Sequence, residues 1–209
     1  MGLFDFFFGG GGSGKRTNVN VVPDVIWLNN TAKLKGIRKD VVAQRSSGAV
    51  GLLLVAHFED VLEQLFKIAA DNDNNFPIKV SLAKDLSTDL VAEWQFDESA
   101  TVAIIVGERH PLPKHDDEVL QFAESLPVQA RLIRHVSLED PLMKAFAGEW
   151  VKKTLQSLGM AEDEAIESQM VSRRIKAAQQ KIEKEAFGDS DAGSAAEWLA
   201  ANVPAMNSD

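Results

Sequence analysis

The pattern of apolar and polar residues between positions 19 and 138 predicts several strands. Residues 50–56 and 101–106 are two short, continuously apolar runs, as expected for strands that are buried on both faces of a sheet. Residues 78–82 and 129–136 alternate between polar and apolar side chains, which is also typical of strands.

Apolar residues at helical spacing separate these strands. Leu34, Ile37 and Val41 follow the N-cap candidates Asn30 and Thr31 and predict an amphipathic helix. Similar spacing predicts helices near residues 61–68 and 116–126, and residues 89–94 are predicted as a short helical turn. Strands that alternate with helices favour parallel pairing, so we expect an open, mostly parallel α/β sheet of about four strands.

After residue 138 the pattern becomes helical. Asp140 and Pro141 predict a helix start, Gly159 a helix end, and residues 161–187 a second, longer helix. We therefore expect four parts: a flexible tail at 1–18, an α/β domain at 19–138, a helical extension at 139–187 and an acidic tail at 188–209, with one helical turn near 195–201.

The two helices of the extension each carry an apolar face. An apolar stripe needs something to pack against, either the sheet domain or another chain. We predict that these faces are interaction surfaces, formed by Leu142, Phe146, Trp150, Ile166, Met170, Ile175 and Ile182.

Composition excludes several classes of protein. The chain has 209 residues, with 22 Lys and Arg against 31 Asp and Glu, and a formal net charge of −9. Such an acidic balance disfavours a nucleic-acid binder, which needs clustered positive charge. The absence of cysteine excludes disulfides, thiolate zinc sites and a cysteine nucleophile. With no long apolar run and no signal-peptide pattern, we expect a cytoplasmic protein.

The N-terminus carries two suggestive features. Gly9, Gly14 and Lys15 resemble the start of a phosphate-binding loop, but Arg16 stands where Ser or Thr is required, and no strand or helix flanks the run. We therefore expect a flexible linker. The aromatic cluster before it predicts weak contact with a partner or with the inner face of a membrane, through Phe4, Phe6, Phe7 and Phe8.

One loop gathers residues that are able to bind a ligand. His110, His115 and Asp116 follow a predicted strand, at the edge where open α/β sheets bind ligands. The alternative is that Asp116 and its acidic neighbours stabilise the first turn of the next helix. The spacing matches no helical metal motif, so we expect no metal site. His57, beside Glu59, follows another strand, and His135 is expected at the surface.

Several stretches resemble SecA, the motor ATPase of bacterial protein export. They begin with the ten residues from Ser137 to Phe146 and continue through Leu158-Gly159-Met160, residues 164–168 and residues 170–175. Weaker likeness precedes them in the same order, as at Gly107-Glu108-Arg109-His110. In that family this region joins the second nucleotide-binding domain to the helical scaffold. The resemblance implies a reduced RecA-like domain followed by a helical extension.

The chain departs from the SecA pattern at the residues that would contact ATP. The family carries an arginine-rich Q-x-x-G-R-x-G-R motif, whereas the corresponding positions here hold Glu118, Gln121, Phe122, Glu124 and Ser125. Because these arginines stabilise phosphoryl transfer, their loss implies no autonomous ATPase and no cofactor. We expect a non-catalytic SecA-like module that binds a protein partner or itself, linked to preprotein translocation. The alternatives are a residual nucleotide- or metal-binding hydrolase, or a peripheral membrane module that uses the Phe-rich N-terminus.

Overall fold

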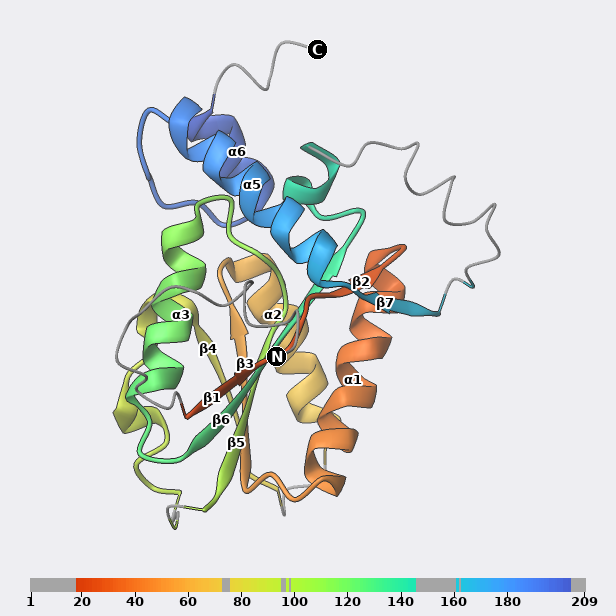
Figure 1. Ribbon diagram of the computed structural model, residues 1–209, viewed down its shortest axis with the longest axis vertical. Coiled ribbons are helices and arrows are strands. Elements are labelled where there is room, and N and C mark those ends of the chain that lie inside the picture. Colours follow the sequence, from red (N-terminus) through yellow and green to blue (C-terminus); the bar gives the residue numbers. More distant parts are fainter. Residues whose placement is uncertain are drawn as a thin grey trace, which may run out of the picture.

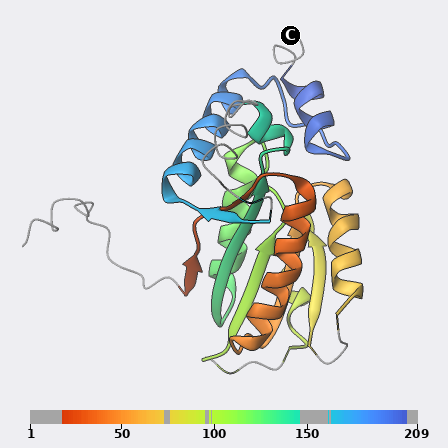
Figure 2. The same ribbon diagram turned by 90° about the vertical axis from the view of Figure 1, so that its right-hand side faces the viewer.

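A mostly parallel sheet runs through the centre of the molecule (Figures 1 and 2). The computed structural model describes residues 18–72, 76–94, 97, 99–145, 161 and 163–203. Seven strands are arranged in the order β4-β3-β5-β6-β2-β7, with β1 also paired to β6. All pairs are parallel except β2 with β7. The strands are β1 (Val19–Val21), β2 (Val25–Trp27), β3 (Gly51–Ala56), β4 (Ile78–Leu82), β5 (Thr101–Val106), β6 (Gln129–Ser137) and β7 (Ala165–Glu167).

This architecture confirms the expected α/β class with a mostly parallel sheet. The four strands predicted from the sequence are β3, β4, β5 and β6, and the three additional strands have only three residues each. β1 and β2 pair with different halves of the long strand β6 and are separated by Val22, Pro23 and Asp24. Such short strands contain too few residues to show an alternating pattern.

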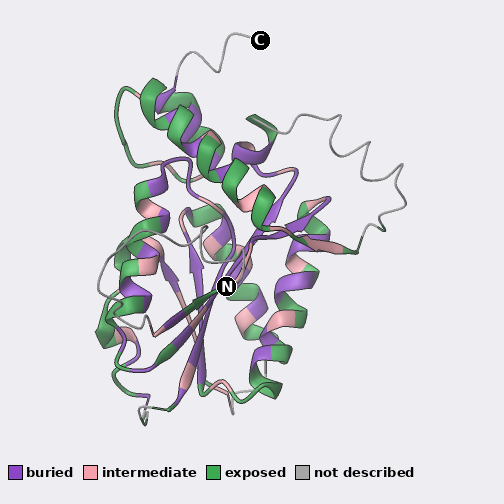
Figure 3. Ribbon diagram, in the orientation of Figure 1, coloured by how far each residue is buried: buried purple, intermediate pink, exposed green. Residues whose placement is uncertain are grey.

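Helices cover both faces of the sheet. Helices α1 (Asn30–Ser46) and α2 (Glu59–Ala70) pack on one face, where buried side chains of α1 and α2 meet those of β3 and β5. Helix α3 (Pro113–Ser125) packs on the other face together with two 3₁₀ turns, Ala83–Asp85 and Thr88–Leu90. The strands between them are largely buried (Figure 3). Asn29, one residue before the expected cap, caps α1 by accepting from the backbone N–H of Ala32 at 2.8 Å.

The C-terminal helices lie across the end of the sheet where the parallel strands finish (Figure 1). They are α5 (Gln169–Glu185) and α6 (Ala195–Asn202), and their apolar residues share a core with β2, β6 and Leu142. The predicted helix at 161–187 is thus shorter, because Ser168 caps α5 and residues 165–167 pair with β2. Among the helices described, none combines the length and apolar character needed to cross a bilayer.

The acidic tail expected at 188–209 differs most from the structure. Ala195, Leu199 and Val203 of this segment are buried in the core, and Trp198 in α6 is only 1% exposed. The segment consists mostly of small and acidic residues, so the sequence did not indicate that its few apolar side chains would anchor it to the core. Residues 1–17, which include the Phe cluster and the glycine run, lie outside the described residues.

His135 is buried, which corrects the expected surface position. Its Nδ1 accepts from the indole N–H of Trp27 at 3.0 Å, and its Nε2 donates to Asp40 at 2.9 Å, an arrangement that fits one neutral tautomer. Trp27 also packs tightly on α1, because a Cβ added at Gly36 would lie 1.9 Å from its ring. Only glycine therefore fits at position 36.

Candidate functional site

The crevice between the ends of β3 and β5 is the natural ligand site of this topology. The chain leaves β3 through α2 on one face and leaves β5 through α3 on the opposite face. Ligands of open α/β sheets bind where the connections diverge in this way, at the carboxyl ends of the strands. His57 follows β3 directly, and Gly107-Glu108-Arg109-His110 follows β5.

Asp116 is the centre of a buried hydrogen-bond network at this edge. Its carboxylate accepts from Arg109 Nη1 at 2.9 Å, from Gln179 Nε2 at 2.6 Å and from His57 Nε2 at 3.0 Å. Arg109 also makes a bidentate pair with Asp24, with both distances 2.8 Å. The network therefore joins β3, β5, α3 and α5, and Asp116 acts as a structural group inside α3.

Glu108 is buried beside this network. One of its carboxylate oxygens accepts from the backbone N–H groups of His57 and Phe58, at 3.2 and 3.1 Å. Burial raises the pKa of Glu108 to about 8, although the positive charge of Lys33 opposes the shift. Glu108 is therefore largely protonated at neutral pH and helps to hold the start of α2.

His110 lies in an aromatic environment. Its ring stacks on Phe58 with centroids 5.1 Å apart and makes edge contacts with His57, His115 and Trp198. Burial lowers the pKa of His110 to about 3, and the neighbouring histidines add to the effect. His110 is consequently neutral across the physiological pH range.

The C-terminal segment lines the crevice, in which little free volume remains. Asp189 accepts from the indole N–H of Trp198 at 3.0 Å and contacts His115 Nε2 at 2.9 Å, while Lys114 forms an ion pair with it. The remaining pocket has a volume of about 80 Å³, far below the 300 Å³ or more of typical small-molecule sites. The chain itself thus occupies the space at the topological switch point.

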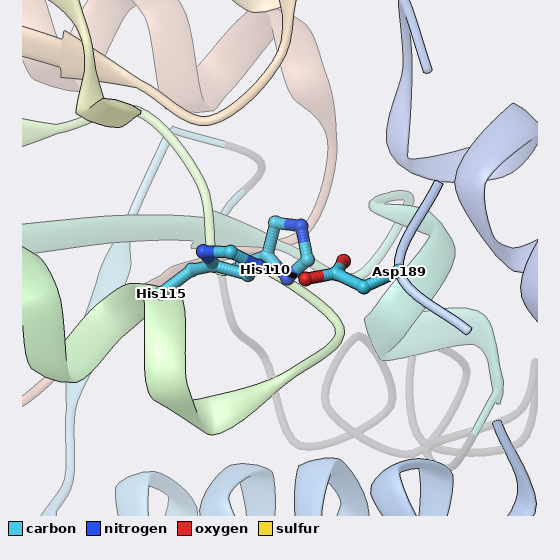
Figure 4. A group of neighbouring side chains, drawn as sticks. All are labelled: His110, His115 and Asp189. Carbon is cyan, nitrogen blue, oxygen red and sulfur yellow. Dashed lines mark hydrogen bonds and ion pairs between the residues drawn. The ribbon is translucent and has the colours of Figure 1, made fainter. Parts of the chain in front are cut away.

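His110, His115 and Asp189 form a group that could offer ligands to a metal ion (Figure 4). Their candidate ligand atoms lie within 4.8 Å of one another. However, His110 Nδ1 accepts from the backbone N–H of Leu112 at 2.9 Å, which places the proton of the neutral ring on Nε2. Histidine that binds a metal through Nε2 normally donates from the other nitrogen, so this hydrogen bond opposes a metal there.

The structure brings together only part of the ligand loop that we predicted. His110 and His115 are adjacent, but Asp116 points into the buried network, and Asp189 takes the place beside the histidines. No local pattern points to Asp189, which lies more than seventy positions after His115 in the chain.

The five positions that the resemblance to SecA places at the arginine motif all lie on α3. Phe122 is buried in the core beneath the sheet, whereas Gln121 and Glu124 are exposed. Glu118 contacts His115 Nδ1 at 2.9 Å, and the Ser125 hydroxyl donates to the carbonyl of Phe122 at 2.7 Å. These residues form an ordinary amphipathic helix that packs on the sheet.

The predicted interaction residues divide into three groups. Leu142, Ile175 and Ile182 are buried in the protein's own core, so their side chains are not available to a partner. Ile166 is half-buried in β7, and Met170 is 68% exposed at the start of α5. Phe146 and Trp150 lie outside the described residues.

Comparison with known proteins supports the resemblance to SecA. The chain is 37% identical over 118 residues to the protein translocase subunit SecA of Xanthomonas euvesicatoria pv. vesicatoria, a match that covers 51% of this chain and 13% of the relative. It is 40% identical over 103 residues to SecA of Stenotrophomonas maltophilia, and 38% identical over 102 residues to SecA of Xanthomonas campestris pv. campestris. Each of these two matches covers 46% of this chain and 11% of the relative. The chain is thus SecA-like over about half of its length and spans about one eighth of these relatives.

No family model matches the chain. Among solved structures, the C-terminal part of the Fun30 ATPase domain is similar with a TM-score of 0.39 and 11% sequence identity. That match covers 71% of this chain and 54% of the other.

Proposed function

We propose that this chain is a non-catalytic SecA-like module that acts in protein translocation by binding a protein partner. The observation that carries the proposal is the filled crevice, in which Asp189 and Trp198 leave about 80 Å³ beside His110. An ATP molecule needs several times that volume. The residues at the arginine-motif positions support the same proposal, because none of them offers a positive charge to a phosphate.

The partner we propose is a SecA protein, and the place of action is the cytoplasm or the inner membrane surface. This assignment rests on the likeness to SecA over about half of the chain. The exposed side chain of Met170, with half-buried Ile166 nearby in sequence, is the part of the expected interaction surface that a partner can reach. An exposed, flexible methionine is well suited to such contacts.

The absence of a nucleotide site is tested by titrating Mg-ATP and Mg-ADP into the full chain in a calorimeter. We expect no saturable binding, either by the natural chain or by the Trp198→Ala and Asp189→Asn variants, which loosen the filled crevice. Phe187→Ala is the matched control, since Phe187 lies in the same segment but is 86% exposed. Saturable binding by the natural chain would contradict the proposal. Binding by the two crevice variants alone would replace it with a self-inhibited nucleotide site.

Binding to SecA is tested by sedimentation velocity with purified full-length SecA. We expect a complex with the natural chain, weakened about tenfold or more by Met170→Glu, because the change places a charge in an apolar contact. Phe66→Glu on α2 is the matched control, since Phe66 is also exposed, at 52%, but lies on a different helix. Failure of the natural chain to bind, or equal weakening by both variants, would argue against this surface.

A further inference from the structure

A second, open pocket lies away from the filled crevice. Its volume is about 240 Å³, and it is bordered by the link between β1 and β2, the end of β6 and the first turn of α5. Three arginines from three different elements line it: Arg109, Arg134 and Arg173. Such a gathering of positive charge is unusual in a chain with a net charge of −9.

Arg134 is the residue that most needs a partner. It is only 5% exposed, and its Nε has no hydrogen-bond partner among the described residues. Burial lowers the pKa of Arg134 to about 10, and the positive charge of Arg109 adds to the shift, although Asp116, Asp24 and Asp117 act in the opposite direction. A buried guanidinium with an unsatisfied donor is costly unless an anion pairs with it.

The acidic group that lines the pocket is already paired with an arginine. Both carboxylate oxygens of Asp24 accept from Arg109, whose remaining contact goes to Asp116. The Asp24 backbone N–H donates to the hydroxyl of Ser172, which ties the β1–β2 link to α5. Arg134 and the exposed Arg173 are therefore the cations available to a ligand.

The first turn of α5 adds a second attraction for an anion. Gln169 and Ser172 of this turn, and Arg173 directly after it, line the pocket, and the N-cap Ser168 satisfies the N–H of Val171. The first N–H groups of a helix have no partner within the helix, and the helix dipole favours negative charge there.

We propose that this pocket binds a phosphoryl oxyanion, either inorganic phosphate or the phosphate of a small monoester. Its two available guanidinium groups come from a strand and a helix, beside the N-terminus of that helix, and such an arrangement suits a tetrahedral anion with several oxygens better than a planar carboxylate. The volume of about 240 Å³ holds such a group with a small substituent and is below that of typical drug-sized sites. The inference is independent of the proposed docking to SecA.

The test is a calorimetric titration of the full chain with inorganic phosphate, at pH 7 and constant ionic strength. We expect saturable binding at one site, weakened about tenfold or more by Arg134→Met and less by Arg173→Gln. Arg174→Gln is the matched control, because Arg174 neighbours Arg173 on α5 but does not line this pocket. Phenyl phosphate is expected to compete if monoesters are accepted, whereas acetate is expected to have no effect.

Thermal melting of the same proteins, with and without phosphate, shows whether each variant is folded and separates loss of binding from loss of folding. Phosphate is expected to raise the melting temperature of the natural chain and of Arg174→Gln, but not that of Arg134→Met. If Arg134→Met does not fold, Arg134→Lys tests the same donor, because lysine keeps the charge but lacks the planar guanidinium. Equal phosphate binding by the natural chain and by the variants at positions 134 and 173 would overturn the proposal, as would competition by acetate at the same concentration.

Discussion

Replacing Asp116 with asparagine is expected to lower the free energy of unfolding by about 3–5 kcal/mol. The carboxylate is buried and accepts from Arg109, Gln179 and His57, so the change leaves Arg109 with only part of its compensating charge. The new amide would also direct N–H groups toward donors that already point at this position. Urea denaturation followed by circular dichroism measures the difference.

The matched control for this change is Asp117→Asn, at the next position of α3. Asp117 is exposed, so its replacement is expected to change the free energy of unfolding by less than about 0.5 kcal/mol. Burial acts to raise the pKa of Asp116, but Arg109 and His57 outweigh it and hold the pKa well below its usual range. The stabilisation is then complete above about pH 4 and is lost only as the pH falls further. A similar effect of both variants at pH 7 would show that Asp116 is not the centre of the network.

Replacing Glu108 with glutamine is expected to stabilise the protein at pH 8 by about 4 kcal/mol. Burial raises the pKa of Glu108 from 4.5 to about 8, so the folded protein holds a proton that the unfolded chain releases between these values. Stability conferred by the protonated form is therefore present below about pH 4.5 and decreases as the pH rises to 8. Glutamine resembles the protonated acid and still accepts from the N–H groups of His57 and Phe58.

The measurement is urea denaturation of the natural chain and of Glu108→Gln at pH 4.5 and pH 8. The two proteins are expected to be nearly equal at the lower pH and to diverge at the higher one. Glu63→Gln on α2 is the control, because Glu63 is exposed and its replacement introduces no such pH dependence. Equal stability of the natural chain and Glu108→Gln at pH 8 would mean that Glu108 is readily ionised in the folded state.

The sequence alone anticipated the elements whose patterns are local. The continuous apolar runs became β3 and β5, which are buried on both faces, and the alternating segments became β4 and β6. The predicted helix near 116–126 begins slightly earlier, because Pro113 occupies its first turn. Short strands such as β7 were not predicted, because three residues are too few to show the alternation of polar and apolar side chains that is typical of a strand.

The candidate site depended on contacts that no local pattern contains. His110 and His115 were recognised from their place after a strand, but their acidic neighbour is Asp189 and not Asp116. Nothing in the sequence around Trp198 indicated that it would lie against His110. In the sequence, Arg134 is simply one polar residue of an alternating strand. Only the fold brings it into the lining of the same pocket as Arg109.

The sequence by itself determined the α/β class, the parallel sheet and the likeness to SecA, because periodicity and short motifs depend only on neighbouring residues. Only the tertiary structure decided what occupies the crevice and where the buried charges meet. These outcomes depend on bringing residues 188–203 across the end of the sheet and α5 against α3, which is a matter of long-range packing. The same packing that fills the crevice near His110 leaves the arginine-lined pocket near Arg134 open.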